Sequence, residues 1–350
     1  MKSEDIAKLA GVSRSTVSRV MNNYPNVPDE TREKVMKIVN EHNYMPNSCA
    51  RTLAGKNSNT IGLFFVIHGG RKDSDRLFRN EYFTTYLDAI VDMANAKDYY
   101  VLVSIVSDEN KYLNINRAFL EKRIDGGIII GTQNDTLSRF DAEKLNTSIV
   151  LFDYKMSDEE LIKYKNNNFT IINSKDKLGI EKAVDYLYNL GHREIGFIKG
   201  NENSMSGRAR YNGFVESMKK RDMDINEDYV LHGDFSAESA YSEVNRTIKN
   251  NKIASAYISG NDSMALGAIR AFKEKGYSIP GDVSIIGFDN IQGAQELDVK
   301  LTTIGSDFYR MAKKAISILD SQIKNENKNN DLQVLEYDVK FFERDTCKKI

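Results

Sequence analysis

The feature that most constrains the fold is a change in hydrophobic periodicity near residue 60. Before it, the apolar side chains of residues 1–56 recur at helical spacing, which predicts helices and no strands. After it, short apolar runs such as 61–67, 148–152 and 283–288 alternate with helical stretches. Alternation of this kind is typical of parallel sheets covered by helices on both faces. About ten such runs exceed what one open sheet of this size usually holds, so we predict two sheets.

The charge is distributed unevenly along the chain. The 350 residues, which are enough for two or three domains, carry a net charge of −1. Residues 1–60 hold nine Lys or Arg and six Asp or Glu, a balance of 9 − 6 = +3, which leaves −1 − 3 = −4 for the rest. A basic head on an acidic body suits a small DNA-binding domain attached to a part that does not contact DNA.

Three features predict a cytoplasmic protein with no membrane partner. No apolar run approaches the roughly 20 residues that a membrane span needs. The N-terminal run MKSEDIAKLAG lacks the apolar core of a secretory signal. The two cysteines, Cys49 and Cys347, are too few for a disulfide framework.

Residues 5–22 have the spacing of a helix-turn-helix. Ala7 is small enough to let two helices approach, Gly11 forms the turn, and Val17 holds the helices together. Ser3 and Ser13 are the predicted caps of the first two helices, and Asp29 opens a third that ends near residue 42. The outward face of the second helix then bears hydroxyl, amide and cationic groups that suit bases and phosphates in a major groove. The predicted DNA contacts here are Ser13, Arg14, Ser15, Thr16, Ser18, Arg19 and Asn22. An ordinary helical hairpin is the alternative, but this face carries no acid.

The runs AGVSRSTVSRVMN, TREKV and NYMPNSCARTLAGK resemble the headpiece of the lactose-repressor (LacI/GalR) family over the first 58 residues. The resemblance implies a DNA-binding domain over residues 1–45 and a hinge helix with its linker over 46–58. It also implies a homodimer on a pseudo-palindromic operator, with hinge residues in the minor groove and Leu53 as the wedge. The hinge contacts are Asn47, Ala50 and Leu53. A two-turn helix with an exposed leucine has little reason to fold before DNA and a partner bury it.

The resemblance extends to about Thr346. It implies a periplasmic-binding-protein-like body over residues 59–346, made of two Rossmann-like α/β subdomains that the chain crosses three times. We expect an N-subdomain at about 59–172 and 305–323, and a C-subdomain at about 173–304 and 331–346. Ligands in such folds bind beyond the carboxyl ends of strands, and a sugar needs forked polar groups with an aromatic plate. The predicted effector-binding residues are Asp153, Arg210, Phe235, Asn261, Asp289, Phe83 and Ser306.

The effector is less constrained than the fold. Residues 68–83 form a charged insert in place of the family's short loop, and its ending LFRNEYF is similar to maltose-type regulators. This favours a sugar or glycoside, although a longer loop can also suit a larger or anionic ligand. The alternative is a corepressor-dependent regulator that responds to a nucleobase, a sugar phosphate or a protein co-effector. On the hinge, Cys49 suits a small apolar contact better than a redox-sensitive cross-link.

An enzyme and a transport-type binding protein are the interpretations from other classes. The run LAGKNS at 53–58 resembles a phosphate loop only superficially, because Ala50 stands where a glycine is needed and no strand precedes it. The four histidines, His42, His68, His192 and His232, lack metal-ligand spacing, and His192 is interpreted as a helix-end or surface residue. A transport protein has no use for residues 1–58. We therefore predict a transcriptional repressor that is not an enzyme and needs no cofactor or metal.

Overall fold

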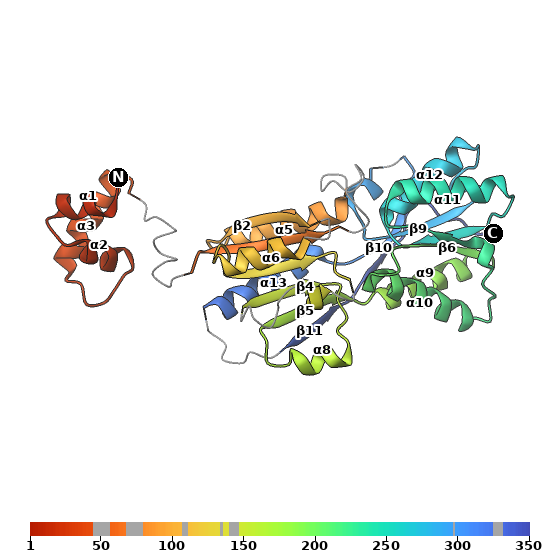
Figure 1. The fold of residues 1–350 in the computed structure, drawn as a ribbon. Coiled ribbons are helices and arrows are strands. Elements are labelled where there is room, and N and C mark those ends of the chain that lie inside the picture. Colours follow the sequence, from red (N-terminus) through yellow and green to blue (C-terminus); the bar gives the residue numbers. More distant parts are fainter. Residues whose placement is uncertain are drawn as a thin grey trace. The chain divides into compact units, whose positions relative to one another are not determined.

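The computed structural model describes residues 1–44, 57–67, 80–106, 111–133, 136–139, 147–296, 298–324 and 332–350. The chain divides into two compact units, residues 1–58 and 59–350 (Figure 1). The predicted hinge contacts Asn47, Ala50 and Leu53, as well as Cys49 and residues 68–79 of the insert, lie outside the described residues. Among the described helices, none is long and apolar enough to cross a membrane.

The first unit contains three helices around a small core. They are α1 (Ser3–Ala10), α2 (Arg14–Met21) and α3 (Asp29–Glu41). Their inward side chains are fully or nearly fully buried: Ile6, Ala7, Ala10, Val17, Val20, Val35 and Val39. Gly11 ends α1 in the left-handed conformation, at φ 61°, where a glycine carries no steric penalty. The helices and the turn predicted from residues 5–22 are therefore confirmed.

The helix caps differ in one respect from the prediction. Ser13 caps α2 as expected, because its Oγ accepts a hydrogen bond from the Thr16 N–H at 3.1 Å. Ser3 does not cap α1, since the helix begins at Ser3 itself. Instead, the Asp5 carboxylate accepts from the Lys2 backbone N–H at 2.8 Å. Asp5 at the third helical position thus accepts from the N-cap N–H, as the acid of a capping box does, and its charge also interacts favourably with the helix dipole.

Two six-stranded sheets organise the second unit, which confirms the predicted architecture. The first sheet has the order β11-β5-β4-β3-β1-β2 and is parallel throughout. Its strands are β1 (Thr60–Val66), β2 (Tyr100–Val106), β3 (Gly126–Ile130), β4 (Ser148–Phe152), β5 (Phe169–Ser174) and β11 (Gln333–Tyr337). The second sheet has the order β12-β10-β9-β8-β6-β7, and only β12 is antiparallel. Its strands are β6 (Ile195–Lys199), β7 (Val230–His232), β8 (Ala256–Ser259), β9 (Ser284–Phe288), β10 (Thr302–Gly305) and β12 (Lys340–Phe342).

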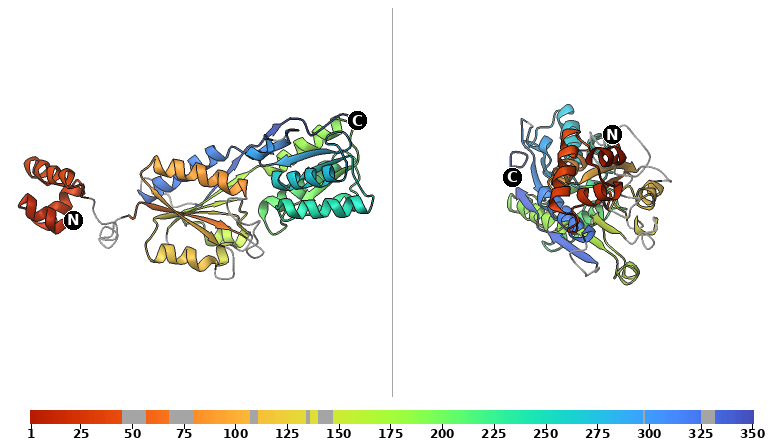
Figure 2. Two further views of the ribbon diagram at one scale, coloured as in Figure 1. Left: turned by 90° about the horizontal axis from the view of Figure 1, so that it is seen from above. Right: turned by 90° about the vertical axis from the view of Figure 1, so that its left-hand side faces the viewer.

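Helices cover both faces of each sheet (Figure 2). On the first sheet, α5 (Glu81–Asn95) and α13 (Phe308–Ile323) pack on one face and α6 (Lys111–Leu120) on the other. On the second sheet, α9 (Asp176–Asn189) and α10 (Met205–Lys219) face α11 (Ala237–Lys249) and α12 (Asp262–Glu274) across the strands. The shorter helical segments are α7 (Thr136–Arg139), α8 (Asp158–Lys163) and the 3₁₀ turns η3 (Glu227–Tyr229) and η4 (Gln292–Ala294). Coverage on both faces explains why the central strands are continuous apolar runs.

The chain passes between the two sheets three times, at residues 174–176, 305–308 and 337–340. The last crossing corrects our prediction, which placed all of residues 331–346 in the C-subdomain. Residues 333–337 instead form β11, which pairs with β5 in the first sheet, and only β12 joins the second. The strand breaks at Asp338, and Val339 is buried in the core of the second sheet. The alternating pattern continues through this break, so periodicity alone could not reveal it.

His192 follows the end of α9, as one of our two alternatives expected, but it is not a surface residue. Only 1% of the residue is exposed, and its ring nitrogens contact Ser255 Oγ at 2.8 Å and the Lys348 carbonyl at 3.1 Å. Burial lowers the pKa of the imidazole. The side chain therefore ties the C-terminal segment to the second subdomain.

Candidate DNA-binding face and effector cavity

The outward face of α2 is exposed as the helical spacing predicts. Val17 and Val20 point into the core, with 1% and 3% of their surface exposed. On the rest of the helix and at its C-cap, Arg14, Ser15, Ser18 and Arg19 are exposed, while Thr16 and Asn22 are half-buried. Hydroxyl groups gather at the start of the helix, where Ser13 Oγ lies 2.7 Å from Ser15 Oγ and 2.9 Å from Thr16 Oγ1. The face offers both donors and cationic groups to a polyanion.

Arg14 has partners of its own in the unbound chain. Its Nε donates to Ser3 Oγ at 3.2 Å, and its Nη1 lies 3.5 Å from a carboxylate oxygen of Glu4. The arginine side chain is 66% exposed and the glutamate 59%. An exposed pair of this kind contributes about 0–1 kcal/mol, so it can be released at little cost. Thus α2 has no acid on this face, as predicted, but α1 places one beside it.

A cavity of about 150 Å³ opens beyond the carboxyl ends of β1, β3 and β4 of the first sheet and β6, β7, β8 and β9 of the second. This is where parallel α/β sheets place their ligands. Sixteen described residues from the two subdomains line it. From the first sheet and its helices come Val66, Ile67, Asn80, Tyr82, Phe83, Gly131, Thr132 and Asp153. From the second come Asn201, Ser204, Ser206, Arg210, Asp234, Phe235, Asn261 and Asp289.

Six of the seven predicted effector residues lie in this wall: Phe83, Asp153, Arg210, Phe235, Asn261 and Asp289. Ser306 does not line the cavity, because it lies at the second crossing between the sheets, directly after β10. Tyr82 and the helix caps Asn80 and Ser204 also line the cavity, although we did not predict them. An Asn or Ser before a helix is a cap signal that could have marked both positions.

Three of the lining residues have left-handed backbone conformations. Their φ angles are 51° at Asp153, 74° at Phe235 and 113° at Asp289. Non-glycine residues rarely adopt such angles, which cost on the order of 1–3 kcal/mol and gather at functional sites. Backbone groups of all three are held by hydrogen bonds: the Asp153 N–H donates to the Ile172 carbonyl at 3.2 Å, the Asp289 N–H donates to the Ile304 carbonyl at 2.6 Å, and the Phe235 carbonyl accepts from Asn261 Nδ2 at 3.0 Å.

Arg210 is the centre of a buried polar network. Its Nε donates to Asp176 at 2.7 Å, and its Nη1 donates to the Gly260 carbonyl at 2.6 Å and lies 3.2 Å from Asp289. The guanidinium also lies over the ring of Phe288, 3.7 Å from its centroid. The arginine and Asp289 side chains are each 5% exposed and Asp176 is 1% exposed. The network fixes the orientation of Arg210 before any ligand binds.

Burial and mutual repulsion raise the pKa of two carboxyl groups in the wall. Loss of water contact is the main cause at Asp289, whose pKa rises to about 7, and the charges of Asp176 and Asp153 add to it while Arg210 opposes it. The pKa of Asp153 rises to about 6, again chiefly through loss of water contact, with the charge of Asp176 adding to it. Arg210 stays protonated, because Asp176 and Asp289 raise its pKa although burial lowers it.

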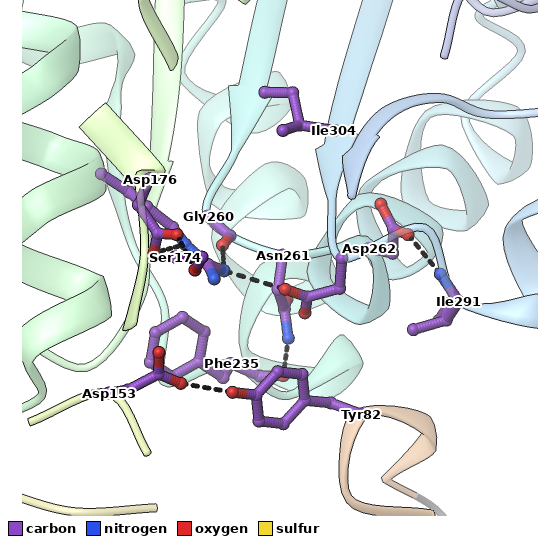
Figure 3. Close-up of polar contacts among 12 residues, drawn as sticks. Tyr82, Asp153, Ser174, Asp176, Phe235, Gly260, Asn261, Asp262, Ile291 and Ile304 are labelled. Atoms are coloured by element: carbon purple, nitrogen blue, oxygen red, sulfur yellow. Dashed lines mark hydrogen bonds and ion pairs between the residues drawn. The ribbon is translucent and has the colours of Figure 1, made fainter. Parts of the chain in front are cut away.

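Tyr82 and Phe235 contribute aromatic rings to the wall. Tyr82 donates its hydroxyl proton to Asp153 (Figure 3). The Tyr82 ring also packs edge-on against Phe308, with the centroids 5.5 Å apart. Phe235 packs so closely on Gly200 that any side chain at that glycine would collide with the ring. Asn261 Nδ2 donates to the Phe235 carbonyl (Figure 3), while its Oδ1 caps α12. Such a site can hold a polar ring with an apolar face.

No group of three or more His, Cys, Asp or Glu in the described part of the chain is placed to hold a metal ion. The carboxylates around Arg210 interact with that cation instead.

Two family models match the chain. Residues 4–47 match the bacterial regulatory proteins of the lacI family, and residues 184–347 match the periplasmic binding protein-like domain. Among curated proteins, the chain is 31% identical over 356 residues to the probable HTH-type transcriptional repressor ExuR of Bacillus subtilis (strain 168), covering 99% of this chain and 98% of that one. It is 30% identical over 351 residues to the HTH-type transcriptional regulator MalR of Clostridium butyricum, covering 99% of each.

Among solved structures, the chain is similar to the lac repressor dimer bound to operator and the anti-inducer ONPF. The TM-score is 0.79 at 27% identity, over 98% of each chain. The complex of the transcriptional regulator CelR with cellobiose shares the fold, with a TM-score of 0.72 at 20% identity over 99% of each chain. The similarity therefore covers the helical head and the two-sheet body together.

Proposed function

Because this chain belongs to the lacI family of DNA-binding transcriptional regulators, we propose that it is a repressor whose operator affinity is set by a carbohydrate in the cavity. The family consists of regulators with an effector-binding domain, not of enzymes. The active species is a cytoplasmic homodimer on a pseudo-palindromic operator. No cofactor or metal is required.

The observation that carries the carbohydrate proposal is the combination of polar groups and ring surfaces in one wall. Asp153, Asp289 and Asn261 offer acceptors and donors for neighbouring hydroxyl groups, and Phe235 offers a flat apolar surface for a sugar ring. The cavity of about 150 Å³ favours a single ring. The run 77–83, which is similar to maltose-type regulators, favours a glycoside instead. The test therefore includes both monosaccharides and glycosides.

The DNA-binding proposal rests on the exposed face of α2 and on the similarity to the operator-bound lac repressor dimer. Arg14, Ser15 and Arg19 are the proposed major-groove readers. Two copies of α2 about one helical turn apart would read two half-sites. Residues 46–58 form the proposed hinge, with Asn47, Ala50 and Leu53 at the minor groove.

In the proposed mechanism, the effector changes the angle between the subdomains at their three crossings. The first and third crossings are joined by a hydrogen bond from the Lys175 N–H to the Tyr337 carbonyl at 2.9 Å and by an ion pair between Lys175 and Asp338 at 2.8 Å. Coupling of about 1–3 kcal/mol between the two sites must be reciprocal, so that DNA weakens effector binding as much as effector weakens DNA binding. In the alternative mechanism the effector is a corepressor, and effector and DNA then strengthen each other's binding.

The test uses the full-length protein. Operator sequences are selected from a random duplex pool, and mono- and disaccharides, sugar phosphates and nucleobases are screened by thermal shift and then by mobility shift. A sugar that stabilises the protein and releases the duplex supports the proposal. A sugar that tightens DNA binding would make the protein corepressor-dependent, and stabilisation by nucleobases alone would overturn the carbohydrate effector.

Leu53→Ala tests the hinge separately. It should weaken operator binding and leave the affinity for effector in free protein unchanged, as measured by calorimetry. An equal loss of effector affinity would contradict the assignment of Leu53 to the DNA side.

A further inference from the structure

The described part of the cavity wall carries more carboxyl groups than cationic groups. Among its described lining residues, the carboxylates are Asp153, Asp234 and Asp289, and the cation is Arg210. Asp176 does not line the cavity but adds a fourth carboxylate directly behind the guanidinium, at 2.7 Å. An anionic ligand would therefore enter a site whose lining already repels it.

Arg210 cannot readily compensate for the excess of carboxylates, because its positive charge is already paired with Asp176 and Asp289. Asp176 holds Nε, Asp289 and the Gly260 carbonyl hold Nη1, and the pairs are almost completely buried. None of these contacts uses Nη2. One edge of the guanidinium can thus donate a hydrogen bond to a ligand oxygen, but the positive charge is shared between two carboxylates. A buried anion without its own counter-charge is strongly disfavoured.

Three helix N-termini also reach the cavity, and a helix N-terminus usually favours an anion. At each of these three N-termini, a capping side chain of the protein already accepts a hydrogen bond from a backbone N–H. Asn80 Oδ1 accepts from the Phe83 N–H at 3.1 Å, Ser204 Oγ from the Gly207 N–H at 3.0 Å, and Asn261 Oδ1 from the Met264 N–H at 2.9 Å. In addition, α5 and α12 carry an acid in the first turn, Glu81 and Asp262. The helix ends therefore do not offset the carboxylates.

The hydrogen-bonding groups of the wall also disfavour an anionic ligand. An ionised carboxylate only accepts hydrogen bonds, and so do the phosphate dianion of a sugar phosphate and the carboxylate group of a sugar acid. Such an anionic group cannot form a hydrogen bond with Asp153 or Asp289 when these carboxyl groups are ionised. A hydroxyl group both donates and accepts, so it can donate to either aspartate and accept from the free edge of Arg210.

We propose that this cavity selects an uncharged polyol over its anionic derivatives, and that Asp176 sets this selectivity by holding the guanidinium of Arg210 from behind. The proposal rests on the carbohydrate effector proposed above and narrows it to uncharged sugars. Asp176 is a positioning residue, since it acts on the ligand through Arg210.

The test compares matched pairs by calorimetry with the full-length protein at pH 8, where Asp153 and Asp289 are mostly ionised. The pairs are glucose with glucuronate, galactose with galacturonate, and glucose with glucose 6-phosphate, and maltose with maltobionate represents glycosides. We expect at least one uncharged member to bind at least tenfold more tightly than its anionic partner. An anionic member that binds more tightly than its uncharged partner overturns the selectivity while leaving a carbohydrate effector in place. Absence of binding by every member overturns the carbohydrate effector and this proposal with it.

Asp176→Asn then tests the residue. With one carboxylate removed from Arg210, the preference for the uncharged member should fall about tenfold. The ratio within a pair is the informative quantity, because a general loss of structure weakens both members equally. An unchanged ratio contradicts the role of Asp176.

Two further variants keep this test decisive. Asp234→Asn removes the charge of an exposed lining carboxylate but keeps an Oδ1 that can accept from the Ser236 N–H, as the carboxylate does at 3.0 Å, and it should lower the same ratio about threefold. Asp228→Asn is the matched control, because it removes a half-exposed carboxylate that pairs with Lys252 and does not line the cavity. Its ratio should equal that of the unchanged protein. A fall as large as that of Asp176→Asn would show that overall charge, and not Arg210, sets the preference.

Discussion

The α2 face and the effector cavity both depend on an arginine beside a carboxylate, but they use it in opposite settings. Arg14 meets Glu4 at 3.5 Å, with 66% and 59% of the two side chains exposed. Arg210 meets Asp176 at 2.7 Å, with 5% and 1% exposed. Water competes with the first pair and is excluded from the second, so the first is easily exchanged for a phosphate or base. The second is part of the protein's structure, and a ligand must fit around it.

The two regions also differ in how the chain builds them. The α2 face comes from one eight-residue helix whose spacing alone decides which side chains point outward. The cavity combines residues from position 66 to position 289, on strands and helices of two sheets. A change on the α2 face should therefore alter recognition with little effect on stability, whereas a change in the cavity should alter both.

The largest expected effect is that of Arg210→Ala. It leaves the buried carboxylates of Asp176 and Asp289 without their cation, which typically costs about 3–5 kcal/mol. Urea unfolding followed by tyrosine fluorescence, in a chain with 18 Tyr and no Trp, measures the loss. A loss below about 1 kcal/mol would mean that the network reorganises freely and that the contrast with Arg14 does not hold.

The next effect depends on pH. The pKa of Asp289 is about 7 in the folded chain and about 3.9 in an unfolded one. Between about pH 4 and about pH 7, the folded state therefore binds more protons than the unfolded state. The stability that this group contributes is complete below about pH 4 and is lost as the pH rises through 7. Asp289→Asn removes that loss, so the variant should gain up to about 4 kcal/mol relative to the unchanged protein between pH 4 and pH 8. Urea unfolding at several pH values measures this, and parallel profiles would contradict the raised pKa.

Arg14→Ala should have a smaller effect, on recognition alone. It should cost about 1–3 kcal/mol at one base position of a selected operator and relax the preference there. Its thermal unfolding should be unchanged, because the pair with Glu4 is exposed. Binding titrations with single-base operator variants give the profile. An equal loss on every sequence would instead make Arg14 a phosphate contact.

The smallest effect is that of Ser13→Ala, which removes the cap of α2. Loss of an N-cap hydroxyl costs about 1 kcal/mol, which corresponds to roughly fivefold lower protection of the α2 amides in hydrogen exchange. Protection around β4 and β9 should not change, because those strands belong to the other unit. A change in both units would show that the two regions are less independent than the comparison suggests.

The sequence by itself determined the elements of both regions. The helices of the first unit, the glycine turn and the Ser13 cap follow from interactions within a few residues, and so does the alternation of strands and helices in the body. It also indicated Asp153, Asn261 and Asp289 in the cavity, because polar residues that follow buried strands meet at one edge of a parallel sheet, whereas Phe83, Arg210 and Phe235 came from the family resemblance.

Only the tertiary structure decided how distant residues combine. Nothing near Asp176 in the sequence indicates that it lies behind Arg210, since the two are 34 residues apart on different helices. The break at Asp338, which sends β11 to one sheet and β12 to the other, likewise depends on which strand each piece pairs with. Short-range periodicity fixes which face of an element is buried, but the order of the strands determines what that face meets, and burial then sets the charge and proton affinity of the cavity.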